Sequence, residues 1–230
     1  MAMTNAEMIA DNPRCCLPLL LDYACGALDE AQSLVIATYI SMNPSVHSFV
    51  QVCEKAGGDL LARECGETTV KQDALQAVLA RIDGKKEPQI EKPCCKPRTC
   101  CEIEVPAPLA RYLAFAGHDV PWQPLLTGMH QYRIPVSRGT RSIARLVKLA
   151  PAVKVPAHNH RGIEITLVLH GSFHDETGAY KRGDISVADS SIHHAPVADA
   201  QTGCVCLTVT DAPLRFAGLL GSLLNPFLRF

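Results

Sequence analysis

The sequence has no excess of charge of either sign, because 22 lysine and arginine residues stand against 23 aspartate and glutamate residues, for a net charge of -1. Proteins that bind nucleic acid or an anionic membrane directly usually carry a basic patch. We therefore expect neither as a partner. Any effect of this chain on transcription would pass through another protein.

Long apolar runs are also lacking. No stretch approaches the roughly 20 apolar residues that span a bilayer. The N-terminal segment MAMTNAEMIADNPR lacks the charged region and apolar core of a secretory signal. These absences predict a cytoplasmic protein with no membrane association. In that reducing compartment the 11 cysteines are expected to be buried thiols, metal ligands or redox sites rather than structural disulfides.

Residues 1–83 show a helical pattern, and we expect a small bundle. Asp29 followed three residues later by Gln32 is typical of a helix start. The pair Gly57-Gly58 is expected to end the third helix. The expected helices cover about residues 18–28, 31–41, 46–55 and 68–82.

Four apolar side chains recur at helical spacing within the last of these helices: Leu75, Val78, Leu79 and Ile82. Two interpretations stay open. The stripe is either the core of the helical bundle or a face that binds another protein.

Residues 84–104 are rich in lysine, glutamate and proline and predict a linker. This segment contains Cys94, Cys95, Cys100 and Cys101. Vicinal cysteines cannot easily direct both sulfurs at one ion, and the CxxC spacing of common zinc sites is missing. We interpret them as incidental thiols of a flexible linker, with a soft-metal or redox site as the alternative.

From residue 105 the pattern changes to short strands separated by glycine and proline, which is typical of an antiparallel barrel or sandwich. The expected fold class is therefore α+β, with a helical domain at 1–83, a linker at 84–104 and a β-domain at 105–230. The expected strands cover residues 128–132, 142–149, 163–169, 184–187 and 204–210.

The strongest chemical signal is His158-x-His160, followed by Glu164 and, further on, His194. Residues i and i+2 of a strand share a face, so the first two imidazoles can point at one place. Three imidazoles and one carboxylate suit a divalent transition metal, zinc first, with iron, manganese and nickel as alternatives. The competing interpretation is a set of scattered surface histidines.

This spacing resembles the first cupin motif, in which HxH, a glutamate and Gly171 follow in the family's order. The second motif begins at Gly183 and supplies the last ligand. His194, which precedes Ala-Pro, fits that position best, and His193 is its competitor. The resemblance implies a jelly-roll domain that binds one metal ion.

A closer resemblance lies in residues 167–184, LVLHGSFHDETGAYKRGD, which are similar to the cupin-like domain of the ChrR anti-sigma factors. Residues 23–28, YACGAL, also resemble the first helices of that family. The resemblance implies a regulator of transcription in a stress response. Its helical domain would bind an extracytoplasmic-function sigma factor, and its metal-binding cupin would sense a signal.

The resemblance also implies structural zinc in the helical domain, but the matching positions are Arg14, Tyr39, Asn43 and Val46. None of these binds zinc in the usual way, so we expect this domain to be held by packing alone. An alternative zinc site could draw on neighbouring residues, namely Cys15, Cys16, His47 and Cys53.

Two rival functions are a metal-dependent cupin enzyme of the dioxygenase kind and a structural zinc cupin that serves as an interaction module. An enzyme would need an open coordination position and a general base. The candidate bases, Asp175 and Glu176, fall in a predicted hairpin turn and are expected to be solvated. We assign no catalytic residue and favour the regulator.

Overall fold

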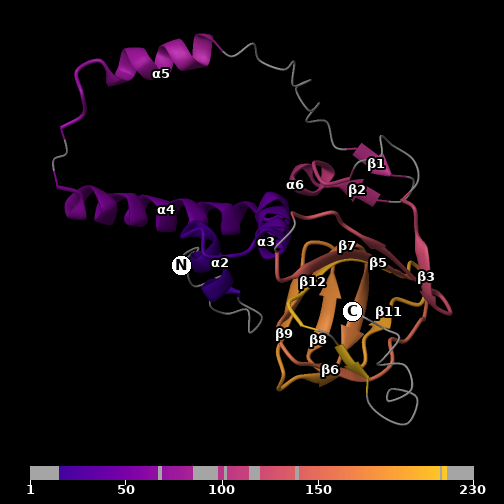
Figure 1. Ribbon diagram of the computed structural model, residues 1–230. Helices are drawn as coiled ribbons and strands as arrows, with labels where there is room; N and C mark the ends of the chain where they lie inside the picture. Colours follow the sequence, from indigo (N-terminus) through magenta and orange to yellow (C-terminus); the bar gives the residue numbers. More distant parts are fainter. Residues whose placement is uncertain are drawn as a thin grey trace.

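The computed structural model describes residues 16–66, 69–84, 98–100, 103–113, 120–137, 140–212 and 214–216. Helices come first and an antiparallel β-sandwich follows, which confirms the predicted fold class (Figure 1). Within the described ranges, no helix is both long and apolar enough to cross a membrane.

The helical part contains α2 (Leu17–Ala24), α3 (Glu30–Met42), α4 (Pro44–Glu64) and α5 (Ala74–Asp83). The predicted start of α3 is confirmed. The backbone N–H of Gln32 donates to Asp29 Oδ1 at 3.0 Å, and the backbone N–H of Asp29 donates to Gln32 Oε1 at 3.3 Å. This reciprocal pair satisfies two donors that a helix end would otherwise leave open.

The predicted end of the third helix at Gly57-Gly58 is wrong, because α4 continues through both glycines to Glu64. A glycine inside a helix costs only about 1 kcal/mol relative to alanine. The sequence that follows, DLLARE, consists mostly of strong helix formers, which offset this cost. The result is a helix of 21 residues that extends away from the sandwich (Figure 1).

The sandwich consists of two antiparallel sheets. The larger has the order β11-β7-β12-β5-β4-β3, with β8 and β9 also paired to β7, and the smaller has the order β10-β6-β13. The five predicted strands correspond to β4, β5, β7, β9 and β12. The bounds are β3 (Gln123–Leu126), β4 (Met129–Arg133), β5 (Ile143–Leu149), β6 (His158–His160), β7 (Glu164–Asp175), β8 (Gly178–Lys181), β9 (Ile185–Ala188), β10 (His193–His194), β11 (Val197–Ala198), β12 (Cys204–Thr210) and β13 (Leu214–Phe216).

The segment predicted as a linker ends in structure rather than in an irregular chain. Strands β1 (Arg98–Cys100) and β2 (Ile103–Val105) form a short antiparallel hairpin, and α6 (Ala107–Ala110) follows. Three of the cysteines discussed above, Cys94, Cys95 and Cys101, lie outside the described residues.

The hydrophobic core crosses from the helices into the larger sheet. Leu34 and Ile36 of α3 belong to the same buried cluster as Leu146 of β5 and Leu207 of β12. The division at residues 83 and 105 therefore stays a prediction about independent folding, since these helices share their apolar contacts with the sheet.

Polar contacts reinforce this junction at both ends of α3. Asp29 and Glu30, at its start, accept backbone N–H bonds from Ser142 at 3.0 Å and Ser137 at 2.8 Å. Beyond its last residue, the side-chain amide of Asn43 donates to the carbonyl oxygen of Gly183 at 3.1 Å. The helix is thus fixed to the sandwich by hydrogen bonds as well as by packing.

Helix α5 lies apart from the sandwich, and none of its residues is buried (Figure 1). Its four apolar side chains are 47–65% exposed: Leu75, Val78, Leu79 and Ile82. The interpretation of this stripe as the core of the helical bundle is therefore wrong for this structure. The stripe is a solvent-facing apolar surface.

We predict that Leu34→Ala in α3 destabilises the protein by about 2–5 kcal/mol, because it removes buried methyl groups and leaves a cavity in the shared core. The matched variant Leu60→Ala, at a side chain that is 61% exposed, should change the free energy of unfolding by less than about 0.5 kcal/mol. Urea unfolding followed by circular dichroism measures both. Similar losses in the two variants would contradict a core shared by helices and sheet.

Candidate metal centre

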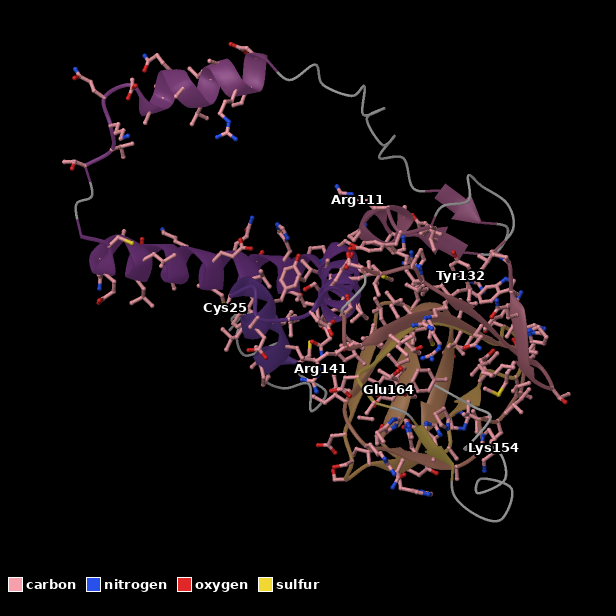
Figure 2. All side chains as sticks on the ribbon, in the orientation of Figure 1. Cys25, Arg111, Tyr132, Arg141, Lys154 and Glu164 are labelled. Carbon is pink, nitrogen blue, oxygen red and sulfur yellow. The ribbon has the colours of Figure 1, made fainter. Side chains whose placement is uncertain are left out.

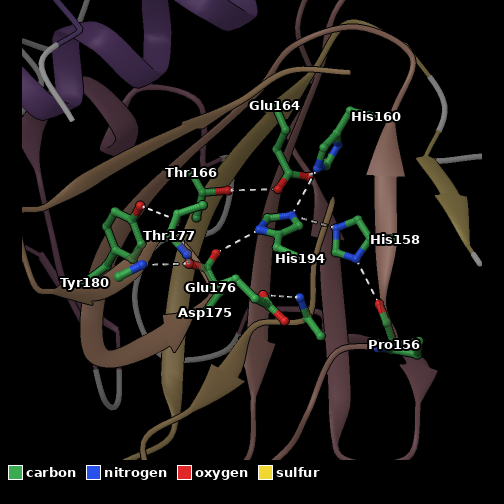
Figure 3. A network of polar contacts seen from close by, with 12 residues as sticks. Pro156, His158, His160, Glu164, Thr166, Asp175, Glu176, Thr177, Tyr180 and His194 are labelled. Atoms are coloured by element: carbon green, nitrogen blue, oxygen red, sulfur yellow. Dashed lines mark hydrogen bonds and ion pairs between the residues drawn. The ribbon is translucent and has the colours of Figure 1, made fainter. Parts of the chain in front are cut away.

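His158 and His160 lie on the short strand β6, and both side chains are buried, at 3% and 4% exposed. Strand β10 pairs with β6 so that His194 stands opposite His158. The Nε2 atom of His194 lies 3.0 Å from Nε2 of His160 and 3.1 Å from Nε2 of His158 (Figure 3). Strand pairing therefore brings His194 next to two histidines that lie 34 and 36 residues before it in the sequence.

Glu164 is the first residue of β7 and lies inside the sandwich (Figure 2). Its Oε2 is 4.0 Å from Nδ1 of His160. The turn before it depends on Gly162, since a Cβ at that position would overlap the carboxylate of Asp211. That carboxylate accepts the backbone N–H of Ile163 at 2.7 Å and fixes the entry into β7.

The four side chains predicted as metal ligands converge. One ligand atom from each of His158, His160, Glu164 and His194 lies within 4.8 Å of the others. Among the described residues they form the one group of this kind built from histidine, cysteine or acidic residues. His193, the competitor of His194, is exposed on the other side of its strand.

Burial keeps the imidazoles of His158 and His160 uncharged at neutral pH. It lowers the pKa of His158 to about 4, with a smaller lowering from the neighbouring His194. Burial likewise lowers the pKa of His160 to about 4. Burial also raises the pKa of Glu164. At neutral pH the site therefore offers unprotonated nitrogen, the form of histidine that binds a metal.

Hydrogen bonds set which nitrogen of His158 and of His194 faces the centre. Nδ1 of His158 donates to the carbonyl oxygen of Pro156 at 2.9 Å, so its Nε2 carries the lone pair. Nδ1 of His194 lies 2.8 Å from Oδ2 of Asp175, which accepts its proton. A hydrogen bond from the outer nitrogen of a ligating imidazole to a carboxylate or carbonyl oxygen orients the ring and raises its basicity.

Asp175 was expected to be solvated in a hairpin turn, and for this residue the expectation is wrong. Its side chain is 0% exposed to solvent and lies against His194. Burial alone would raise the pKa of Asp175, but hydrogen bonds from His194 and Thr177 outweigh burial and lower it to about 2. Sequence spacing gave no signal for this contact, because it depends on how β7 and β10 meet. The neighbouring Glu176 accepts the backbone N–H of Ala195 at 2.9 Å.

The helical part shows no comparable convergence within the described ranges. Where the resemblance implies zinc ligands, Val46 is buried in the apolar core and Asn43 bonds to the sandwich. Of the residues considered for an alternative site, Cys16 is buried in the core and His47 is exposed. Arg14 and Cys15 lie outside the described residues.

The metal-ligand group borders a cavity of about 100 Å³ inside the sandwich. His158, Glu164 and His194 form part of its wall, together with Arg145 and several hydroxyl-bearing and apolar side chains. Cys206 also lines it, and its Sγ is 3.3 Å from Sγ of Cys204. Both cysteines are buried in β12.

Comparison with known proteins identifies relatives that share this architecture. The family model of the ChrR cupin-like domain matches residues 112–213. The anti-sigma-E factor ChrR of Cereibacter sphaeroides is 40% identical over 211 residues, which are 92% of this chain and 95% of the relative. The crystal structure of Rhodobacter sphaeroides SigE in complex with the anti-sigma ChrR matches with a TM-score of 0.69 and 36% identity, over 84% of this chain and 96% of that one. Since the likeness covers helices and sandwich together, this chain belongs to the family of ChrR anti-sigma factors.

Proposed function

We propose that this protein is a cytoplasmic anti-sigma factor that regulates transcription in a stress response. Its helical part, residues 1–83, binds an extracytoplasmic-function sigma factor, and its cupin domain, residues 105–230, holds one divalent transition metal and senses a signal. Residues 84–104 connect the two. Family membership supports the role, and the exposed apolar stripe of α5 supports a binding surface for the partner on the helical part.

The stripe needs a partner for a physical reason. A helix of ten residues is marginal in water unless another surface packs against it. Residues Leu75, Val78 and Leu79 have no such surface in the described chain, since no residue of α5 is buried. Val52, Leu60 and Leu61 of α4 are also exposed, at 61–66%. Exposed apolar side chains grouped along a helix in this way are typical of a protein interface.

The enzyme alternative is disfavoured by the state of its candidate bases. Asp175, with a pKa near 2, is a weak base that is engaged by His194. Glu176 accepts the backbone N–H of Ala195, which also lowers its pKa. A general base works best with a pKa near the operating pH, and neither carboxylate meets that condition.

The ligand set supports zinc as the metal, with iron, manganese and nickel as alternatives. Imidazoles and one carboxylate suit zinc. The bonds from Nδ1 of His158 to Pro156 and from Nδ1 of His194 to Asp175 are of the kind seen around ligating histidines. Because burial lowers the pKa of His158 and of His160 to about 4, these two imidazoles are unprotonated at neutral pH, which is the form that binds a metal.

We expect the purified protein to contain about one metal ion per chain. His160→Ala should remove most of it, because it deletes a ligand from the centre of the group. His174→Ala, at an exposed histidine on β7, should leave the content unchanged. Elemental analysis measures all three proteins. A second ion that survives His160→Ala would show an additional site and contradict a helical part without zinc.

Asp175→Asn should lower metal affinity by about 10- to 100-fold, because an amide cannot accept the Nδ1 proton of His194 as a carboxylate does. The control is Asp199→Asn, whose carboxylate accepts bonds from residues 201 and 202 in an exposed turn. Competition with a chromophoric zinc chelator gives both affinities. Equal affinities for the two variants would remove Asp175 from the metal site.

Val78→Asp should reduce the recovery of the sigma factor with the full-length chain by about tenfold or more, because it places a charge in an apolar interface. Val187→Asp on β9 is the matched control, with a side chain of similar exposure, 40% against 53%, on the sandwich. Affinity purification from cells that express both proteins measures the recovery. Equal loss with Val187→Asp would contradict binding through α5.

A further inference from the structure

One row of side chains across the larger sheet is polar, although it lies inside the sandwich. Arg145 of β5 pairs with Thr208 of β12, which pairs with Thr166 of β7, which in turn pairs with Ser186 of β9. All four line the cavity beside the metal-ligand group. Because paired residues of adjacent strands share a face, they form a continuous strip of hydrogen-bonding groups.

Arg145 is the charged member of this strip and is only 5% exposed. Burial lowers its pKa to about 10, so it remains a cation at neutral pH. Its Nη1 donates to Oγ1 of Thr210 at 3.4 Å. A guanidinium fixed in a cavity wall, surrounded by hydroxyl groups, is suited to binding a carboxylate.

The opposite end of the same cavity is apolar. The inward side chains next along β5 are Val147 and Leu149, and Met129 of β4 stands opposite Leu149. Leu125 and Val155 complete this end. A second charged group would meet no partner there, whereas a short hydrocarbon would be favoured.

The volume of the cavity indicates the length of chain that it can enclose. An apolar cavity of about 150 Å³ accepts benzene, which has six heavy atoms. A cavity of about 100 Å³ therefore suits an aliphatic chain of roughly four carbons.

We propose that this cavity binds a short-chain aliphatic monocarboxylate, with the carboxylate at Arg145 and the chain against Val147. Its role as the signal of the regulator rests on the proposed function, but the binding itself requires no partner protein. The strands that would contact it also carry α3 on their other face, since Leu146 and Leu207 belong to the core shared with that helix.

The test is calorimetric titration of the zinc-loaded full-length chain with butanoate. We expect saturable binding of butanoate, and binding weaker by about tenfold or more for 1-butanol, which lacks the charge, and for butanedioate, which carries a second one. Absence of butanoate binding, or equal binding of butanoate and 1-butanol, would overturn the proposal.

Variants locate the site. Arg145→Gln and Thr208→Val should weaken butanoate binding, the first by about tenfold or more. Val147→Phe fills the apolar end and should abolish butanoate binding while the zinc content stays at that of the unsubstituted chain, which also shows that this variant folds. Val187→Phe, on the exposed face of β9, should bind butanoate normally. Normal butanoate binding by Val147→Phe would show that the ligand binds elsewhere and would contradict the assignment.

The two proposals fail separately. If the sigma factor is recovered with the chain but butanoate does not bind, the ligand assignment falls and the regulator stands. If butanoate binds as described but no sigma factor is recovered, the cavity assignment stands and its role as a signal of this regulator falls.

Discussion

The alternation of side chains along β5, β7 and β12 is the constraint on which the rest of this structure depends. One face of these strands carries Leu146, Leu167 and Leu207, which pack in the core shared with α3. The other face carries Arg145 and Glu164, which line the cavity beside the histidines. Because the period of a strand is two residues, a shift of one residue in register would exchange these faces and destroy both.

Local patterns in the sequence were sufficient to predict most of the elements and the convergence of the metal-ligand group. The capping box at Asp29 and the HxH spacing on a strand each depend on residues a few positions apart, so they can be read without tertiary information. The role of Asp175 could not be predicted in this way, because its partner His194 comes from another strand. The continuation of α4 through Gly57 could not be predicted from the glycine alone, because its small cost to the helix is outweighed by the helix-forming residues that follow.

The contact between helices and sandwich is the feature that differs most from the prediction of two domains joined by a linker. Asn43 occupies a position where the family resemblance implies a zinc ligand, and here its amide bonds to Gly183 of the sandwich. Val46, at another such position, is packed in the core. At these two positions, packing and a hydrogen bond to neighbouring elements fix the helices, where the resemblance implies a metal ion. A sequence pattern alone does not reveal such contacts.

The exposed apolar stripe of α5 has a consequence for the turnover of this protein in the cell. A short helix without tertiary contacts opens readily, and proteases cleave backbone that opens. A partner that buries the stripe would close this opportunity, so the bound chain would outlive the free one. Under the proposed function that partner is the sigma factor, and the abundance of this chain would then follow the abundance of the sigma factor.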